Sequence, residues 1–341
     1  MAATLRRAGV REILLLHGTF MGGDAFGFAR EFSRFSTRAG RALRKLTKGI
    51  VNQVVGEAGN FTSEYATDMG KLLNADGAKS IGVSVLDWGG ENHHLGRAEG
   101  AVILLHHLLQ RSWADSDRVL VWGHSHGGNV LALASQLLGA SGEMRSRFFA
   151  AARSHYRHPL IGRIDLPAWD EVRSALEQRP RKTLPDIDYV TFGTPLRYRW
   201  GDAEGARLMH FVNHRPLIEA SPAQAQYPES IEEVMGAHGG DYIQQLGIAG
   251  TDFPPNIFAW RSWKAELRLR RLLQRGVRRR DLMRHLRRGL RVSLDGLTLL
   301  VDYPDTPPGL RDQIAGHGIY TSSAWLPFHL REVARRYYPS E

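Results

Sequence analysis

The stretch VLVWGHSHGGN, residues 119–129, decides the fold that we expect for this chain. A short apolar run, Val119 to Trp122, leads into Gly123-His124-Ser125-His126-Gly127, and a second apolar run, 130–138, follows. This order predicts a strand, a sharp turn bearing a serine, and a helix, and the turn fits the pattern G-x-S-x-G. The flanking glycines suit such a turn because side chains there would keep the strand and the helix apart. Ser125 should then project its hydroxyl from a sheet edge, above the positive end of a helix.

Six apolar runs predict the strands of one sheet. Most are continuous in Val, Ile and Leu, as in a parallel sheet buried on both faces. Helical patterns such as Arg97–Leu109 and Asn129–Leu138 lie between them, and this alternation indicates an α/β fold. We therefore predict a single domain over residues 1–341, with a mainly parallel sheet and helices on both faces. The runs are residues 12–16, 81–87, 118–123, 187–193, 208–213 and 296–303.

Two insertions, residues 141–185 and 215–292, interrupt this pattern, and the second carries the positive charge of the chain. The formal net charge is +10, and residues 261–291 hold thirteen Lys and Arg against Glu266 and Asp281, which gives +11. Two interpretations remain open. The segment is either a helical cover packed on the sheet with its arginines solvated, or a lid whose basic face meets anionic lipid or an acidic partner.

The basic segment predicts two helices separated near Gly276. On the first helix, we expect the apolar stripe to consist of Trp263, Leu267 and Leu273. On the second, Leu282, Leu286 and Leu290 recur at a spacing of four residues.

The composition indicates in which compartment the protein works and which chemistry it cannot perform. The chain has no cysteine, which excludes disulfides and thiolate chemistry and fits a reducing compartment. The run Ile13 to Leu16 is too short for the core of a signal peptide, and no stretch reaches the length of a membrane-spanning helix. We therefore expect a soluble, cytoplasmic protein.

A serine in such a turn points to acyl transfer, which needs a base, a carboxylate that orients the base, and amide donors for an oxyanion. One donor is the N–H of His126, and the other lies after the strand that ends at Leu16, at Thr19 or Phe20. Gly18 lets that backbone approach a substrate. We expect the residues around the serine to bind substrate: His17, Gly18, Phe20, Trp88 and His124.

Two histidine-bearing stretches have alternative interpretations. His124 and His126 flank Ser125, but no acidic or cysteine partner stands near them, so we expect neither a metal nor a cofactor. The stretch Asp87–His94 follows a strand on the same sheet edge as the serine. It lines the pocket, or it is a capped loop that leads into the next helix.

The base is expected after the last strand, because in sites of this kind the order is Ser, Asp or Glu, His. Only His317 and His329 follow residues 296–303. Gly316 and Gly318 let a loop present the His317 ring, whereas His329 stands in a helix-like stretch and is expected to be structural. We therefore choose His317 as the base.

The acid has two main candidates. Asp241 lies in a loop beyond the strand at 208–213 and ranks first. Asp302 ranks second, since it interrupts an apolar run where an unpaired carboxylate would be costly. Asp202 and Asp252 are lesser candidates, and the order of the first two stays open.

These motifs together resemble the α/β-hydrolase superfamily, and within it the lipase- and esterase-like members. The resemblance rests on His17-Gly18, the turn at 123–127, Thr191-Phe-Gly-Thr-Pro195 and Gly316-His317-Gly318, and it does not extend to the insertions. The chain departs from the family in two ways. It starts almost at the His-Gly strand, so the first two antiparallel strands are expected to be missing, and residues 213–216, Asn-His-Arg-Pro, stand where an acid is usual.

The sequence thus predicts a cofactor-free serine hydrolase that cleaves carboxylic esters, from small molecules or lipids, through an acyl-enzyme on Ser125. Two alternatives remain: an acyltransferase or thioesterase on the same scaffold, or a non-catalytic protein of this fold that binds an acidic partner or a membrane through residues 261–291. The basic segment has few interleaved aromatic residues and no recognised motif, which disfavours nucleic acid as the partner. The sequence does not determine the acyl group, the alcohol or the oligomeric state.

Overall fold

A computed structural model of the chain gives the architecture. It describes residues 1–19, 61–158, 160–178, 184–195, 197–201, 206–216, 221–247, 252, 255, 259–273, 291–303 and 316–339. Phe20, Asp202 and the predicted second basic helix lie outside these residues.

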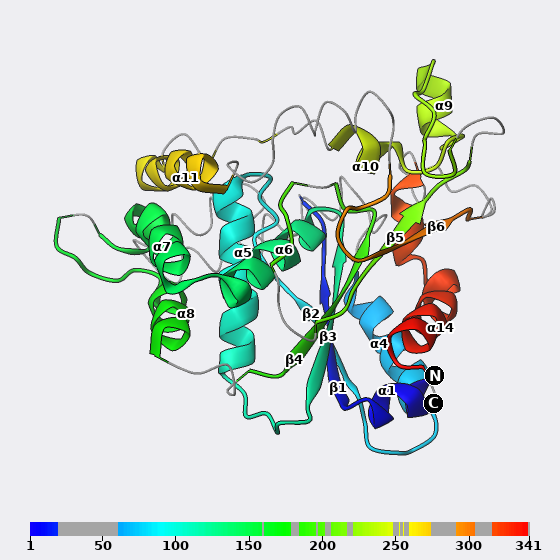
Figure 1. The fold of residues 1–341 in the computed structure, drawn as a ribbon, viewed down its shortest axis with the longest axis horizontal. Helices are drawn as coiled ribbons and strands as arrows, with labels where there is room; N and C mark the ends of the chain where they lie inside the picture. Colours follow the sequence, from blue (N-terminus) through cyan, green and yellow to red (C-terminus); the bar gives the residue numbers. More distant parts are fainter. Residues whose placement is uncertain are drawn as a thin grey trace.

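All six predicted strands are present in one sheet, in the order β2-β1-β3-β4-β5-β6, and every neighbouring pair is parallel (Figure 1). The α/β prediction is therefore confirmed. Because all strands run the same way, their carboxyl ends meet at a single edge of the sheet. The strands are β1 (Val10–Leu16), β2 (Gly82–Leu86), β3 (Arg118–His124), β4 (Asp186–Phe192), β5 (Leu208–Asn213) and β6 (Leu297–Val301).

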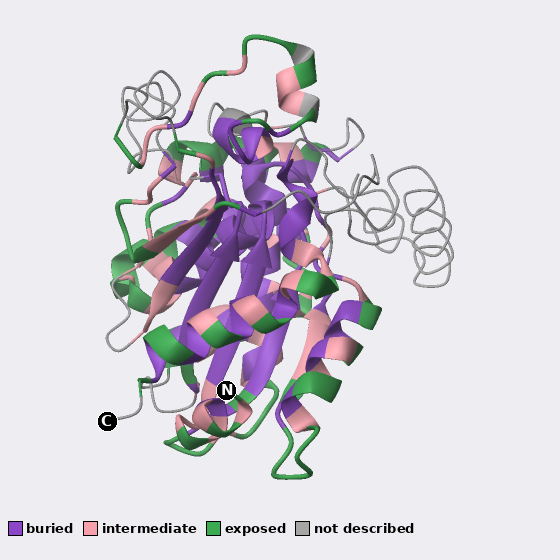
Figure 2. Ribbon diagram, turned by 90° about the vertical axis from the view of Figure 1, so that its right-hand side faces the viewer, coloured by how far each residue is buried: buried purple, intermediate pink, exposed green. Residues whose placement is uncertain are grey.

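Helices cover both faces of the sheet, as the continuous apolar runs predicted. Along β1, Leu14 and Leu16 belong to one apolar core, whereas Ile13 and Leu15 belong to the other. Figure 2 shows the central strands buried along most of their length. The first core holds α5 (His94–Leu109) and α6 (His126–Gly139), and the second holds α1 (Ala2–Arg7), α4 (Ser63–Asn74) and α14 (Leu326–Tyr337). Two short 3-10 helices, Gly318–Thr321 and Ser323–Trp325, precede α14.

The two insertions contribute further helices. Residues 141–185 form α7 (Gly142–Tyr156) and α8 (Pro167–Gln178). In residues 215–292 the described helices are α9 (Ile231–Met235), α10 (Tyr242–Gly247) and α11 (Trp260–Leu273). No helix in the described part of the chain is both long and apolar enough to span a bilayer.

The helix α11 differs from the prediction in its place and in its buried face. It packs on α7 and α5 rather than on the sheet, so it forms an outer layer (Figure 1). The predicted stripe is wrong at Leu267, which is exposed, whereas Leu273 packs on the first core. The buried side chains of α11 include Ser262, Ala265 and Leu269. Small residues at the contact let α11 approach α7 closely, and the Ser154 hydroxyl donates a hydrogen bond to the Arg261 carbonyl.

His329 belongs to the second core, as its helix-like setting predicted. Its ring lies on α14 among Phe192 and Phe211, and its Nε2 is 2.7 Å from the Tyr303 hydroxyl. Burial lowers the pKa of His329 to about 3. The imidazole is therefore neutral in the folded protein at neutral pH.

We predict that His329 makes the protein less stable in acid. Below pH 6.5 the unfolded state takes up a proton that the folded state does not, so the free energy of unfolding falls as the pH drops from 6.5 toward 3, by up to about 1.4 kcal/mol per pH unit. Urea unfolding should be measured across this range for Tyr303→Phe and for Tyr303→Phe/His329→Phe, which differ only in the imidazole. The double variant should lose less stability per pH unit, and equal slopes would contradict the prediction.

Candidate active site

Ser125 stands in a strained turn between β3 and α6, as the sequence predicted. Its φ and ψ are 51° and −129°, and it is one of two described residues other than glycine with a positive φ. Such a backbone costs free energy and persists only where the surrounding structure enforces it. The Ser125 N–H donates to the Phe192 carbonyl at 2.9 Å, which ties the turn to the end of β4.

Three glycines allow the backbone to close around Ser125. A Cβ at Gly123 would lie 2.7 Å from the backbone N of Gly128, and a Cβ at Gly127 would lie 2.7 Å from the His17 carbonyl oxygen. A Cβ at Gly18 would lie 2.9 Å from the Ser125 Cβ. These glycines therefore bring β3, α6 and the loop after β1 together at one point.

His317 pairs with Asp241 at the same edge of the sheet. The His317 Nδ1 lies 2.7 Å from the Asp241 Oδ2, and both side chains are buried. An ionised carboxylate only accepts, so the proton of a neutral His317 lies on Nδ1. The opposite nitrogen, Nε2, is buried and has no hydrogen-bond partner among the described residues.

Gly193 joins this pair to the serine turn. It directly follows Phe192, whose carbonyl holds the Ser125 N–H. A Cβ at Gly193 would lie 2.5 Å from the Asp241 Oδ2 and 3.1 Å from the His317 Cε1. The end of β4 therefore contacts the serine turn on one side and the His317–Asp241 pair on the other.

Asp241 is held by two further donors. The Gln244 N–H donates to its Oδ1 at 2.8 Å, and the Tyr320 hydroxyl donates to its Oδ2 at 2.9 Å. Burial, and then the charge of Asp241, raise the pKa of Tyr320 well above 10, so this hydroxyl stays protonated. The same hydroxyl accepts from the Asn213 N–H at 2.7 Å. Tyr320, which the sequence did not suggest, therefore links the Asp241 carboxylate to Asn213 at the end of β5.

The other candidate acids lie elsewhere. The side chain of Asp302 is 61% exposed and forms an ion pair with Arg215 at 3.2 Å. Asp252 belongs to a separate cluster with Arg97 and Arg197. Of the described aspartates that the sequence singled out, only Asp241 contacts His317.

Three residues expected to bind substrate have structural contacts. The His124 Nε2 donates to the His317 carbonyl at 3.1 Å, and burial, followed by His317, lowers the pKa of His124 well below 6.5. Trp88 is buried, donates from its indole N–H to the His17 carbonyl at 2.9 Å, and stacks on the His17 ring. These contacts connect the loops around Ser125 to one another.

His126 has a fixed tautomer. The Asn129 Oδ1 accepts from the Arg197 N–H and its Nδ2 donates to the Pro195 carbonyl, which sets the orientation of the amide. The second Nδ2 hydrogen then points at the His126 Nδ1, 3.1 Å away. Burial, and then Arg97 and Arg197, lower the pKa of His126 well below 6.5. His126 is therefore neutral, with its proton on Nε2.

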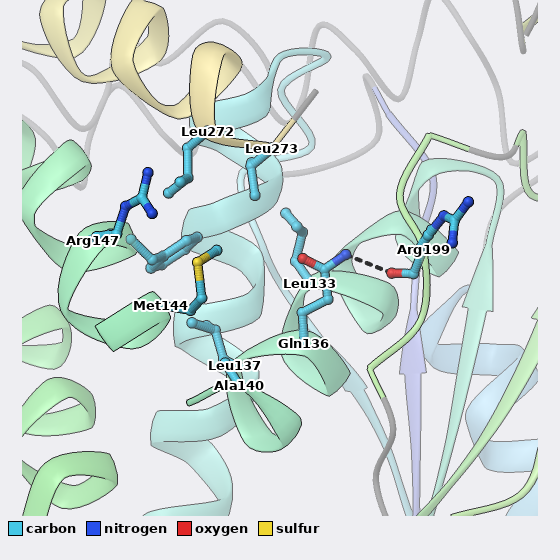
Figure 3. Close-up of a pocket in the computed structure, with 10 residues that line it drawn as sticks. Leu133, Gln136, Leu137, Ala140, Met144, Arg147, Arg199, Leu272 and Leu273 are labelled. Carbon is cyan, nitrogen blue, oxygen red and sulfur yellow. Dashed lines mark hydrogen bonds between the residues drawn. The ribbon is translucent and has the colours of Figure 1, made fainter. Parts of the chain in front are cut away.

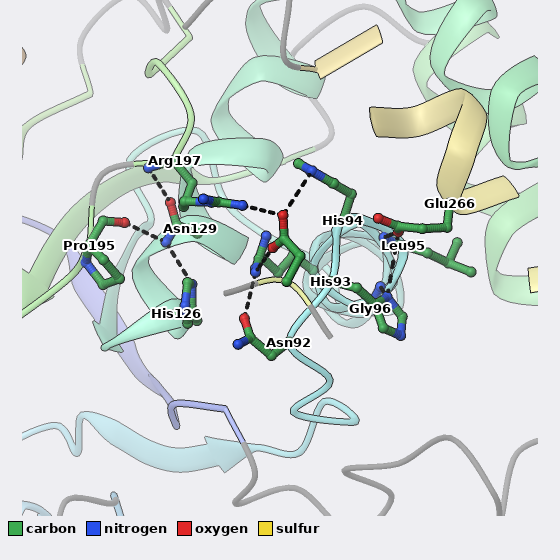
Figure 4. Close-up of polar contacts among 12 residues, drawn as sticks. Asn92, His93, His94, Leu95, Gly96, His126, Asn129, Pro195, Arg197 and Glu266 are labelled. Atoms are coloured by element: carbon green, nitrogen blue, oxygen red, sulfur yellow. Dashed lines mark hydrogen bonds and ion pairs between the residues drawn. The ribbon is translucent and has the colours of Figure 1, made fainter. Parts of the chain in front are cut away.

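A buried polar cluster adjoins His126 (Figure 4). Arg97 donates to Asp252 at 2.7 Å and to the Tyr198 hydroxyl at 3.0 Å, and Arg197 also donates to Asp252. Burial opposes the ionisation of Asp252, but the hydrogen bond with His94 and the two arginines outweigh it and lower its pKa. The cluster fastens the loop after β4 to the start of α5.

The stretch Asp87–His94 proves to be largely a capped loop. The His93 Nδ1 accepts from the Gly96 N–H at 2.9 Å and so caps the beginning of α5. The His94 Nδ1 lies 2.8 Å from the Tyr198 hydroxyl. The capped-loop interpretation therefore describes these residues better than an open pocket wall does.

A cavity of about 400 Å³ lies between α6, α7 and α11 (Figure 3). Its walls are mainly apolar, with Leu133 and Leu137 of α6 on one side and Leu272 of α11 on another. Leu133 is about two turns along α6 from His126. This cavity is therefore separate from Ser125.

No three potential metal ligands gather in the part of the chain that the structure describes. No protein-family model, no curated protein and no solved structure matches this chain.

We predict that Gly123→Ala destabilises the protein, because its Cβ would meet backbone atoms of α6 at 2.7 Å. Gly70→Ala is the control, since a Cβ at this helical position of α4 meets no atom within 4 Å. Urea unfolding should show a loss of about 1–3 kcal/mol for Gly123→Ala and a gain of up to about 1 kcal/mol for Gly70→Ala. Equal stability of the two variants would mean that β3 and α6 do not depend on this approach.

Proposed function

We propose that the protein is a cofactor-free serine hydrolase of the α/β-hydrolase type, lipase- or esterase-like, which cleaves carboxylic esters through an acyl-enzyme on Ser125. One observation carries the proposal. The His317 ring is held through Nδ1 by the buried Asp241, 2.7 Å away, while its Nε2 has no partner among the described residues, at the sheet edge that bears the strained Ser125 turn.

In the proposed reaction, the Ser125 hydroxyl oxygen attacks the acyl carbon and the His317 Nε2 takes up its proton. Asp241 stabilises the imidazolium that forms. His317 then gives the proton to the leaving alcohol, which departs and leaves an ester on Ser125. Water attacks this ester while His317 again takes a proton, and the acid is released as Ser125 regains its hydrogen.

The oxyanion is assigned to two backbone N–H groups. His126 is the first residue of α6, so its N–H has no acceptor within the helix and lies at the positive helix end. Thr19 follows Gly18, which packs on the Ser125 Cβ. The loss of one such donor typically raises a barrier by about 3 kcal/mol.

The test is hydrolysis of p-nitrophenyl esters of increasing chain length. Ser125→Ala and His317→Ala should lower kcat by about 10⁴-fold or more, and Asp241→Asn by about 10⁴-fold, because each removes part of one proton-transfer unit. Asp302→Asn is the matched control, since Asp302 is exposed and pairs with Arg215. It should stay within about twofold of the wild type.

Labelling by a fluorophosphonate distinguishes this proposal from a non-catalytic scaffold. The wild type and Asp302→Asn should form a covalent adduct on Ser125, and Ser125→Ala should not. An unlabelled wild type that also shows no ester turnover would refute the proposal. Equal losses for Asp241→Asn and Asp302→Asn would refute the assignment of the acid.

A further inference from the structure

The outer face of α11 combines exposed apolar and basic side chains. Trp260 is 59% exposed and Leu267 is 48% exposed, although both are large hydrophobic residues. Lys264, Arg268 and Arg271 are exposed between and beyond them. The spacing of these five residues places them on one side of the helix, opposite the buried Ala265 and Leu269.

No acidic residue of α11 lies on this face of the helix. Glu266 is the only acidic residue of α11, and it is buried on the opposite side, where it accepts from the Leu95 N–H at 2.6 Å. Lys264, Arg268 and Arg271 form no ion pair with any residue that the structure describes. The face is therefore a local patch of positive charge that no described acidic residue neutralises.

A hairpin between α7 and α8 extends this surface. Leu160 and Ile161 at its tip are 89% and 69% exposed. The hairpin is closed by an antiparallel bridge between Arg157 and Ile164, so the tip projects from the body of the protein (Figure 1).

The hairpin and α11 are joined. Asp165, at the base of the hairpin, forms an ion pair with Arg261 at the beginning of α11, beside Trp260. The exposed aliphatic tip and the exposed face of α11 therefore belong to one connected part of the molecule.

We propose that this docking face, made of the hairpin tip and the outer side of α11, binds membranes that contain anionic phospholipid. Tryptophan and aliphatic side chains with basic residues beside them suit the boundary between headgroups and acyl chains. The basic residues attract anionic headgroups, while Trp260, Leu160 and Ile161 enter the boundary. A nucleic acid or an acidic protein would use the charges but would leave the aliphatic tip in water.

The α11 part of the docking face lies near the carboxyl edge of the sheet (Figure 1). Glu266 fastens α11 to Leu95 in the first turn of α5, and α5 begins after the loop that leaves the carboxyl end of β2. Ser125 lies at that same edge. The docking does not depend on catalysis, so it is tested in a variant without the serine.

The first test measures how much the basic residues contribute to membrane binding. The full-length variant Ser125→Ala is sedimented with vesicles of phosphatidylcholine that contain about 30% phosphatidylserine or none. Adding Lys264→Glu/Arg268→Glu/Arg271→Glu should weaken binding to the anionic vesicles by about tenfold or more. The matched control is Arg7→Glu/Lys79→Glu/Arg331→Glu, which reverses three exposed charges outside the docking face and should stay within about twofold. Equal losses for the two triple variants, or no binding by the parent, would overturn the proposal.

The second test measures the apolar side chains. Leu160→Ser/Ile161→Ser should weaken vesicle binding by at least about tenfold, whereas Leu72→Ser/Leu294→Ser, at exposed leucines elsewhere, should not.

Brominated phosphatidylcholine in the anionic vesicles should quench tryptophan fluorescence, and Trp260→Phe should abolish most of that quenching. If the hairpin pair and Trp260 have no effect, and a labelled oligonucleotide binds as tightly as the vesicles, the face is a polyanion surface and the proposal fails. Urea unfolding of each variant checks that the fold is retained.

Discussion

The close approach of β1, β3 and α6 is the constraint on which the site depends. Where Gly127 meets the His17 carbonyl, no side chain fits, and Ser125 is forced into a conformation that residues other than glycine rarely adopt. Because every strand of the sheet is parallel, the loops after β1, β3, β4 and β5 all leave from one edge. The strain at Ser125 is sustained by this convergence of backbone rather than by side-chain contacts alone.

The His317–Asp241 pair lies at that same edge of the sheet. A buried carboxylate is costly without partners, and Asp241 has three: His317, Tyr320 and the Gln244 N–H. Two of these donors stand on a segment that follows β6, far along the chain from Asp241. The pair therefore exists only when the last strand and the loop beyond β5 have both docked on the sheet.

The sequence predicted the strands and the serine turn because continuous apolar runs and a G-x-S-x-G turn are local signals. It ranked Asp241 above Asp302 but left the order open, since both follow strands and only the docked loops decide which one contacts His317. The predicted stripe on α11 is wrong at Leu267, because the contact with α7 uses small residues where the pattern placed a leucine. The cluster of Arg97 with Asp252 joins residues 155 positions apart, a pairing that no local pattern could indicate.

The two histidines that flank Ser125 have a consequence for the electric field at its hydroxyl. Burial keeps both His124 and His126 uncharged, and in His126 two nearby arginines reinforce the effect. Each ring is therefore a much weaker proton acceptor than a free imidazole, although both lie adjacent to Ser125 in the chain. Near neutral pH neither ring adds a titrating charge beside the Ser125 hydroxyl, so a spectroscopic reporter placed there would record no change of charge on either of them.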